Sequence, residues 1–434
     1  MAEVAPEAEV ATSPYAVLVH NSTYRWFYAG QGASLIGTWS QAAAARWIVY
    51  EITESERAVG IVDAVEVLPG VVVGLVAGAV ADKVSGRLML TAMQVGQAVL
   101  AFLLAVMVGS GSIAIWQMAL ILAFSQVFVT FEEPSRQVFQ RHLVGRSALG
   151  GAIALETGLF NVSRVLGPAV AGLSLSLLGQ SAPFAINACS FLAALVILSF
   201  LRTPHNHEAD TDPTETESET EAEVGILAGF KYVWNDRRVL RIFLLLGFFG
   251  VAGLGYTALI PSYAQKQLDS GAGGYSALQV GGGIGSTVGA FVVAGMAASK
   301  RRDLLVSGGM VLAGVALALA GVVPGLLGHK FGLPTAVALM FLNGMGTIVV
   351  FATAQTLIQA AVPDSIRGRI SGLWMIVFSA STPIGSLASG LLAQPLGVVL
   401  IMVASGLICI VVAGLVFFTG ILIPSKKDEA EGLV

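Results

Sequence analysis

Long apolar segments recur from one end of this 434-residue chain to the other, and they restrict its fold more than any other feature. A helix that crosses the hydrocarbon core of a bilayer needs roughly 20 mainly apolar residues. The sequence predicts twelve such helices, which cover residues 25–49, 58–81, 88–109, 112–132, 149–176, 180–201, 240–260, 275–299, 303–328, 334–360, 370–393 and 397–420. We therefore expect an all-α membrane protein with twelve transmembrane helices.

The scarcity of charged residues supports this prediction. Only 12% of the residues are charged, whereas an ordinary soluble domain has about 25%. A soluble protein of this size could not cover its surface with so few charges, so a soluble enzyme or a disordered scaffold is a poor interpretation. The net charge of −4 gives no basic field that would attract nucleic acid.

Lysine and arginine are distributed unevenly between the two sets of loops. When both termini and the loops after the even-numbered helices are placed on one side, that side holds 18 of the 23 basic residues. The opposite side holds Arg57, Lys266 and Lys330. Since basic residues concentrate on the cytoplasmic side of a membrane, we expect cytoplasmic N- and C-termini and a location in the inner membrane.

The predicted helices fall into two similar halves. Residues 25–201 and 240–420 each hold six of them, and a basic loop follows the second helix of each half. Between the halves, residues 202–239 begin as an acidic, Thr- and Ser-rich stretch that predicts a disordered linker, and they end in a short interfacial helix. Residues 1–24 and 421–434 are predicted cytoplasmic tails. Six plus six helices in parallel repeats is an arrangement expected of a secondary transporter whose site lies between the halves.

Five stretches stand out from the apolar background. They are YRWFYAGQGASLIGTWSQAAAARWIVYEIT from Tyr24, the loop from Gly78 to Arg87, FEEPSRQ from Phe131, NVSRVLGPAVAG from Asn161 and VPDSIRGR from Val362. Together they resemble the major facilitator superfamily, and more narrowly its branch of enterobactin exporters and related secretion-effector efflux proteins. The resemblance covers about residues 21–420. It implies two six-helix bundles that export a small molecule by alternating access.

The resemblance also implies roles for two groups of residues. A cytoplasmic conformational switch would consist of Gly78, Asp82, Lys83, Arg87, Glu132 and Arg136. In such a switch Asp82 pairs with a basic group or a helix N-terminus in one state and releases it in the other. The alternative is that these charges only fix the topology at the lipid headgroups. Gly167, Pro168 and Gly172 match a motif of the fifth helix in antiporters, where they would seal the protein against leakage or only allow a packing kink.

Five ionisable side chains lie inside the predicted helices, all in the first half: Arg46, Asp63, Glu66, Glu156 and Arg164. A charge at the centre of a bilayer costs about 2.5–3.5 kcal/mol, so each needs a partner or an aqueous cavity. Asp63 and Glu66 share one helix face, and Arg46 lies at a similar depth. One hypothesis is a structural pair between Arg46 and Asp63. The other is that a carboxylate binds the coupling proton or a cationic group, because two carboxylates this close favour proton binding.

Glu156 and Arg164 are predicted on the same helix. They are eight residues apart, about 12 Å along the axis, so they cannot pair directly without help. Arg164 is expected either to join an ion pair with Glu66 or Glu156 or to hold an anionic substrate.

These features favour proton-coupled export of a siderophore-like or drug-like molecule, with Asp63, Glu66 and Glu156 as proton sites and Arg46 and Arg164 as their charge partners. Two alternatives remain open: a carrier of iron or other metal complexes that uses Asp63 and Glu66, and a membrane scaffold that kept the fold and lost transport. The sequence contains no recognisable pair of nucleophile and base of the kind that an enzyme needs. It also contains no Walker motif that would predict nucleotide binding. We expect no cofactor and no bound metal, and a monomer in the lipid bilayer whose partners are protons and the substrate.

Overall fold

The computed structural model of the chain describes residues 17–19, 21–201, 229–296, 302–362 and 366–419. All long elements in these ranges are helices. The predicted C-terminal tail, most of the predicted N-terminal tail and most of the predicted linker lie outside the described residues.

The first half contains long helices that follow one another with short turns. They are α2 (Ser22–Thr53), α3 (Glu56–Lys83), α4 (Gly86–Gly109), α5 (Ile115–Leu178) and α6 (Ala182–Phe200). The element α5 is two helices, because Gly145 has a φ of +73°, a conformation that interrupts the helix and that glycine adopts without strain.

The second half begins with a segment whose helical type changes along its length. This segment consists of α8 (Arg237–Leu254), the 3₁₀ turn η2 (Gly255–Leu259), α9 (Ile260–Ser262) and the π turn η3 (Tyr263–Gln267). Five regular helices follow it: α10 (Gly271–Gly295), α11 (Arg302–Leu326), α12 (Gly328–Ala361), α13 (Arg367–Leu396) and α14 (Val398–Thr419).

Ten helices in the described part of the chain are long and apolar enough to cross a membrane. The two parts of α5 count separately among them, and α8 to η3 count as one. The helix α2 does not meet the same criterion, although it contains 32 residues, because polar side chains such as Gln31, Gln41 and Arg46 lower its hydropathy. The helix α3 contains 28 residues, and part of it lies outside the residues to which this count applies. The chain is therefore an all-α, multi-pass membrane protein.

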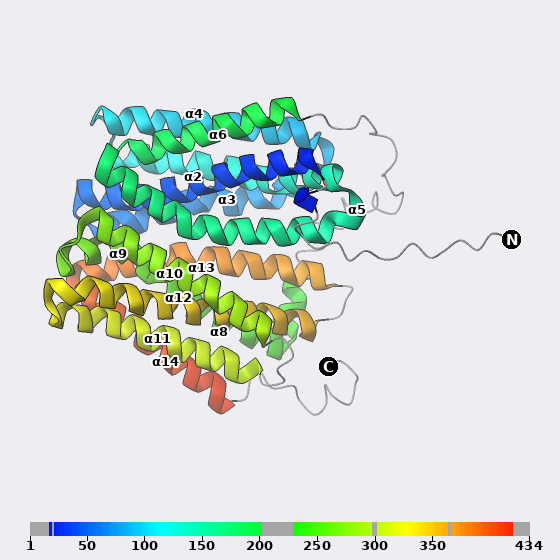
Figure 1. Cartoon of the computed structure of the whole chain (residues 1–434). Coiled ribbons are helices and arrows are strands. Elements are labelled where there is room, and N and C mark those ends of the chain that lie inside the picture. Colours follow the sequence, from blue (N-terminus) through cyan, green and yellow to red (C-terminus); the bar gives the residue numbers. More distant parts are fainter. Residues whose placement is uncertain (1–16, 20, 202–228, 297–301, 363–365, 420–434) are drawn as a thin grey trace, which may run out of the picture.

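The two halves form two layers (Figure 1). Helices α2 to α6 pack on one another in one layer, and α8 to α14 form the other. The main contacts across the boundary join α3 to α13 and α5 to α10. These four helices therefore form most of the boundary between the halves.

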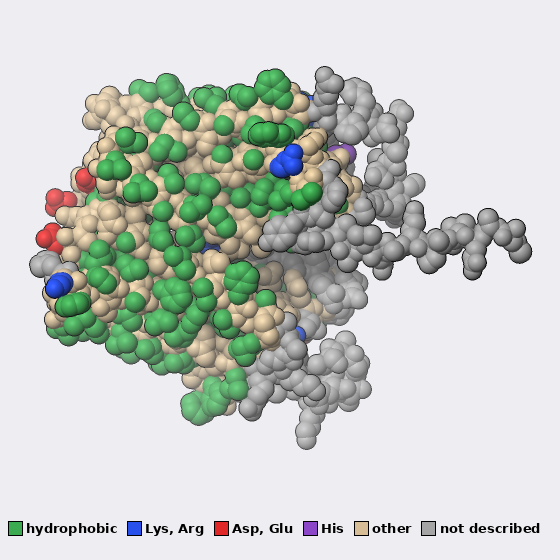
Figure 2. All heavy atoms as spheres, in the orientation of Figure 1, with side chains coloured by type: hydrophobic (Ala, Val, Ile, Leu, Met, Phe, Trp, Pro, Cys, Tyr) green, Lys and Arg blue, Asp and Glu red, His purple; other side chains and the backbone are tan. Residues whose placement is uncertain are grey.

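The flanks of the molecule are covered with apolar side chains, and its charged side chains gather towards the ends of the helices (Figure 2). Phe102, Phe200 and Phe418 are 64%, 79% and 87% exposed. A soluble monomer rarely exposes so extended an apolar surface. We interpret these flanks as the surface that contacts lipid.

Glycines in α10 allow close packing within the second half. A Cβ atom at Gly285 would lie 1.9 Å from the Phe341 carbonyl oxygen, and one at Gly289 would lie 2.6 Å from the Met345 carbonyl oxygen. Both neighbours belong to α12, so α10 and α12 approach backbone to backbone as small residues permit in membranes.

Candidate functional site

An ion pair joins the first two long helices. Arg46 Nε lies 2.9 Å from Asp63 Oδ1, and the Asp63 side chain is 4% exposed. The pair forms because α2 and α3 are connected by a short turn, which brings two residues 17 positions apart to the same depth. The structure confirms the pair predicted from the sequence. The other carboxylate oxygen, Asp63 Oδ2, is buried and accepts no hydrogen bond from any described residue.

Glu66 extends this pair into a cluster of three charges. It lies almost one turn beyond Asp63 on α3 and interacts electrostatically with both Arg46 and Asp63. Two carboxylates thus share one guanidinium group. The cluster has one excess negative charge when all three groups are ionised, and a single proton or cation would neutralise it.

The second half contacts this cluster through Tyr275 of α10. The Tyr275 hydroxyl interacts electrostatically with Arg46 and Asp63. It donates a hydrogen bond of 3.0 Å to the Ala43 carbonyl oxygen and accepts one of 3.3 Å from Gln279 Nε2. The charge cluster therefore lies at the boundary between the halves, where a change in its charge would affect how they meet.

The halves are also joined where α2 ends and α3 begins, which we call the α2–α3 end. Glu56 Oε1 accepts hydrogen bonds from Ser262 Oγ and from Lys266 Nζ, the latter at 3.1 Å. We call these three residues the Glu56 contact. Burial raises the pKa of Glu56, but the hydrogen bonds from Ser262 and Lys266 outweigh burial and hold this pKa below its usual value. The ionised carboxylate is thus the form that joins the halves.

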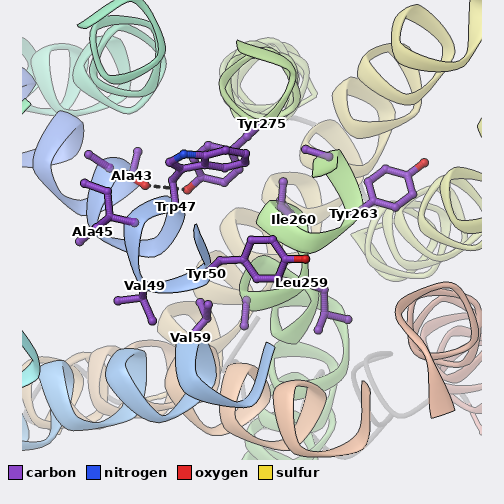
Figure 3. Packing of buried hydrophobic residues seen from close by; sticks show 14 of the residues in the cluster. Ala43, Ala45, Trp47, Val49, Tyr50, Val59, Leu259, Ile260, Tyr263 and Tyr275 are labelled. Carbon is purple, nitrogen blue, oxygen red and sulfur yellow. Dashed lines mark hydrogen bonds between the residues drawn. The ribbon is translucent and has the colours of Figure 1, made fainter. Parts of the chain in front are cut away.

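Aromatic rings fill the space beside the Glu56 contact (Figure 3). Trp47 of α2 packs on Tyr275 of α10 with ring centroids 5.6 Å apart, and Lys266 Nζ lies 5.6 Å from the centroid of the Tyr50 ring. Trp47, Tyr50 and Tyr275 are all buried. A shallow hollow of about 250 Å³ lies against Trp47 and Tyr50 and is lined in part by Glu51 and Glu54. The α2–α3 end is therefore closed by packed side chains from both halves.

The Glu56 contact was not predicted from the sequence. The available signal was the opposite charge of Glu56 and Lys266 on the same expected side of the membrane. That signal did not identify a pair, because the two residues are 210 positions apart and belong to different halves.

The predicted motif of the fifth helix produces close packing. A Cβ atom at Gly167 would lie 2.3 Å from Trp39 Cβ, so α5 and α2 touch at this point. A Cβ atom at Gly172 would lie 2.3 Å from Ser276 Oγ, so α5 touches α10 of the other half. Pro168 lies between them inside α5. The two glycines therefore serve two different contacts, one within the first half and one across the boundary.

The contact between α5 and α10 extends only part of the way along α5. Seven residues before Gly172 on α5, Val165 makes a second contact: a Cβ atom at Gly283 of α10 would lie 3.1 Å from Val165 Cγ2. We call these two contacts, Gly172 with Ser276 and Val165 with Gly283, the α5–α10 seam. Gly158 follows at the next seven-residue step on nearly the same face of α5. No heavy atom of a described residue lies within 4 Å of a Cβ atom built there. Among the described residues, the packing that joins α5 to α10 at Gly172 and Val165 therefore does not continue at Gly158.

Arg164 lies next to Val165, at the end of the seam nearer Gly158. Its guanidinium carbon is 5.7 Å from the centroid of the Trp39 ring, and it interacts electrostatically with Tyr256 of the second half. The expected ion pair with Glu66 or Glu156 is not formed. Among the described residues Arg164 has no carboxylate partner.

Glu156 pairs with Arg136 instead. Arg136 Nε and Glu156 Oε1 are 2.9 Å apart, although neither atom makes an aligned hydrogen bond. The two parts of α5 lie side by side after the interruption at Gly145, and this brings Arg136 to the level of Glu156. The spacing along one helix could not indicate this partner, because it depends on the turn between two helices. Arg136 also contacts Glu133, one turn away.

Glu132 is held by two glutamine side chains of α4. It accepts hydrogen bonds from Gln94 Nε2, at 3.2 Å, and from Gln97 Nε2. All three side chains are buried. The sequence predicted a role for Glu132 but not for Gln94 and Gln97, because glutamines within a polar helix face give no specific signal.

The remaining switch residues are only partly described. Arg87 donates hydrogen bonds to the carbonyl oxygens of Leu198, at 2.8 Å, and Ser199, at 3.3 Å, near the C-terminal end of α6. Such contacts satisfy terminal helix carbonyls. Gly78, Asp82 and Lys83 lie on α3, but their side-chain surroundings are outside the described part of the structure.

The model of the family described as "Transmembrane secretion effector" matches residues 12–432. The multidrug efflux pump Tap of Mycolicibacterium fortuitum is 23% identical over 381 residues, which cover 85% of this chain and 87% of that protein. The staphyloferrin A transporter of Staphylococcus aureus is 24% identical over 244 residues, 56% of this chain and 59% of that protein.

The fold resembles that of solved transporters. The structure of a mutant of the nucleoside transporter NupG superimposes with a TM-score of 0.74 and 13% sequence identity, over 93% of this chain and all of that chain. At this identity the likeness concerns the fold alone.

Proposed function

Because the chain belongs to the transmembrane secretion effector family of major facilitator transporters, we propose that it exports a small molecule in exchange for protons. In this proposal residues 25–201 and 240–420 are two six-helix bundles that move against each other. The helices α2 and α3 supply the two membrane spans beyond the ten that length and hydropathy identify. The substrate binds between the bundles and is exposed to each side of the membrane in turn.

The proposed orientation follows from the basic residues. The side that holds 18 of 23 lysines and arginines is cytoplasmic, so the α2–α3 end faces outwards and both termini are in the cytoplasm. The protein lies in the inner membrane and acts as a monomer. In this orientation the Glu56 contact closes the outer side, and the part of α5 at Gly158, which lies beyond the α5–α10 seam, faces the cytoplasm, where an exported substrate is loaded.

The single observation that supports proton exchange most strongly is the cluster of Arg46, Asp63 and Glu66 beside Tyr275 of the other half. We assign the coupling proton to Glu66, because Asp63 is held by Arg46 and Glu66 accepts no hydrogen bond from a described residue. Protonation of Glu66 removes the excess negative charge. The charge at the boundary then differs between the protonated and deprotonated states of Glu66. This difference links proton binding to movement of the halves.

Glu156 and Arg136 form a second charged pair nearer the cytoplasmic side. We propose that this pair, Glu132 and Arg87 belong to the cytoplasmic switch together with Gly78, Asp82 and Lys83. Glu156 is the second proton site of the proposal, because protonation would release Arg136 to Glu133 alone. The helix-five residues Gly167, Pro168 and Gly172 keep the outer part of α5 sealed.

The relatives bear on the substrate class. One is named a multidrug efflux pump and another a staphyloferrin A transporter, and we propose a drug-like or siderophore-like substrate for this chain. The second name also supports the alternative in which an iron or other metal complex binds at Asp63 and Glu66. The scaffold alternative predicts no substrate-dependent flux at all.

The proposal is tested by proton movement in proteoliposomes under an imposed pH gradient. The panel contains siderophores, their iron complexes, macrolides and lipophilic cations, and the wild type is compared with Glu66→Gln, Asp63→Asn and Glu156→Gln. We expect substrate-dependent proton flux that is lost in Glu66→Gln. Substrate movement that persists without proton flux would refute the proton coupling, whereas flux of iron complexes that depends on Asp63 would favour the metal alternative.

A further inference from the structure

Arg164 differs from Arg46 and Arg136, the two arginines of the first half that form ion pairs with described residues. Arg46 is paired with Asp63, and Arg136 is paired with Glu133 and Glu156. Arg164 has neither an ion pair nor a hydrogen bond among the described residues, and its side chain is only partly exposed. A cation in such a place is costly unless it has an anionic partner or water. Its surroundings therefore lack the negative charge that the other two arginines have.

Aromatic side chains lie beside Arg164. Its guanidinium carbon is 5.7 Å from the centroid of the Trp39 ring, and Phe160 packs edge-on against Trp39 with ring centroids 5.6 Å apart. Because no described residue forms a hydrogen bond or an ion pair with the guanidinium group, its N–H groups can present the planar fork that matches a carboxylate.

The second half supplies the opposite wall. Tyr256 interacts electrostatically with Arg164, and its hydroxyl donates a hydrogen bond of 2.8 Å to Asn343 Oδ1. Asn343 Nδ2 in turn donates to the Ala313 carbonyl oxygen at 3.1 Å. Tyr256 and Asn343 are buried and already partnered. They present a fixed neutral wall to Arg164 rather than a competing carboxylate.

The position of Arg164 also fits a binding site. A Cβ atom at Gly283 would lie 3.2 Å from the Arg164 carbonyl oxygen, so the Arg164 backbone lies in the tight part of the α5–α10 seam. One turn towards Gly158, Phe160 is 44% exposed. Arg164 therefore lies between the packed part of the seam and the exposed ring of Phe160.

We propose that Arg164, Trp39 and Tyr256 form a binding site for an organic anion that carries an aromatic ring. The guanidinium fork binds the carboxylate, and Trp39 and Phe160 provide the apolar surface on which the ring packs. Arg164 and Trp39 belong to the first half and Tyr256 belongs to the second, so a bound anion would contact both halves. The proposal names the substrate class of the exporter and in that respect rests on the proposed function, but anion binding itself does not require transport.

The test is equilibrium binding to the purified full-length protein in detergent, measured by isothermal titration calorimetry. The probes are aromatic carboxylates and their uncharged amides, beginning with 1-naphthaleneacetate and 1-naphthaleneacetamide. The amide has the same ring and nearly the same shape, so the ratio of the two affinities reports the charge alone. We expect the carboxylate to bind about tenfold to a hundredfold more tightly, as a charge-assisted hydrogen bond provides.

Three variants separate a binding role of Arg164 from a structural one. Arg164→Gln should abolish the preference for the carboxylate, and Arg164→Lys should keep part of it, because the charge remains while the planar fork is lost. Arg25→Gln is the control, since it removes the same charge from an exposed position at the start of α2. A structural role would weaken the carboxylate and the amide equally. If Arg164→Gln does not fold, Tyr256→Phe and Arg164→Lys still report the affinity ratio.

The proposal is overturned if no carboxylate of the series binds better than its amide to the wild type, or if the preference survives in Arg164→Gln. Its failure is distinct from failure of the proposed function. Proton-coupled transport of neutral or cationic compounds without a carboxylate preference would retain the exporter and reject the anion site. A carboxylate preference that depends on Arg164, in a protein without any substrate flux, would retain the site and reject the exporter.

Discussion

Glu56 Oε1 of the first half and Lys266 Nζ of the second half are 3.1 Å apart, at the end of the molecule where the halves are closed. The Glu56 side chain is 7% exposed, whereas that of Lys266 is 49% exposed. A pair with one partner in solvent contributes only about 0.2–1 kcal/mol. The contact is therefore strong enough to bias two states that differ little in free energy and weak enough to break during transport.

Loss of the carboxylate at position 56 should open the outer side more often. We expect Glu56→Gln to raise the ratio of outward-open to outward-closed protein by about fivefold at most, because about 1 kcal/mol is the upper value for such a pair. Double electron–electron resonance between spin labels on the outer ends of α2 and α10 measures this ratio. Glu54→Gln, which changes a neighbouring exposed glutamate, should leave it unchanged, and an equal shift in both variants would contradict the assignment.

The outer closure should also depend on external pH. The pKa of Glu56 is lowered in the closed state by its hydrogen bonds, so the carboxylate stabilises that state above its ordinary pKa of about 4.3. The stabilisation should be lost as the external pH falls below this value and through the lowered pKa of the closed state. The same spin-label distances measured between neutral and acidic pH should therefore change in the wild type. In Glu56→Gln this acid-induced component should be absent.

A methyl group at position 172 should act against the closed outer seam. The Cβ atom of Gly172→Ala would lie 2.3 Å from Ser276 Oγ and 2.4 Å from Ser276 Cβ, and a serine Cβ cannot move away without its backbone. We expect this variant to favour the outward-open state and to slow transport. Gly158→Ala is the matched control on the same helix, because its Cβ atom would meet no heavy atom of the described residues within 4 Å. It should be neutral or stabilise the helix by up to about 1 kcal/mol. Inhibition of equal size in the two variants would show that helix propensity, not the seam, is responsible.

The Arg46–Asp63 pair should contribute to folding as well as to charge coupling. In a Glu66→Gln background, Asp63→Leu leaves the Arg46 guanidinium group without a carboxylate partner and should destabilise the protein by about 3–5 kcal/mol, as for other buried pairs. The double variant Arg46→Met with Asp63→Leu in the same background should recover most of that loss, because none of the three groups then carries an unpaired charge. Thermal unfolding in detergent measures both. If the double variant is no more stable than Asp63→Leu, then Asp63 does not stabilise the fold through its pair with Arg46.

Glu132 should require its negative charge, because both of its partners are donors. Glu132→Gln places an amide against Gln94 Nε2 and Gln97 Nε2, so one buried donor loses its acceptor. An unsatisfied buried donor costs about 1–3 kcal/mol, and thermal unfolding should report a loss of that size. Glu133→Gln is the comparison, since Glu133 is 53% exposed and its pair with Arg136 contributes less. Greater destabilisation by Glu133→Gln than by Glu132→Gln would contradict the claim that the buried charge of Glu132 contributes more to stability.

The sequence predicted the all-helical membrane fold and one ion pair, for reasons that are local in the chain. Apolar runs identify most of the spans, and the short turn between α2 and α3 makes the depths of Arg46 and Asp63 comparable. Of the two alternatives for Arg164, the ion pair with Glu66 or Glu156 is not formed, and the binding of an anion stays a prediction. Glu156 pairs with Arg136 because two helices meet after Gly145, and helical spacing contains no information about how antiparallel helices are aligned. The Glu56 contact lies across 210 positions of the chain, and only the packing of α3 against the second half brings its residues together. The functional roles assigned to these residues stay predictions.

The seven-residue spacing of Gly158, Val165 and Gly172 has a geometric consequence for the opposite state. An α-helix has 3.6 residues per turn, so each step of seven residues falls about 20° short of two full turns. The row of contacts that seals α5 against α10 therefore winds slowly around a straight α5. A seam that closes at the cytoplasmic end cannot extend this row unchanged. The helix must roll or bend so that a neighbouring row faces α10, and the exchange between the two states is then a rotation of α5 about its own axis as well as a tilt.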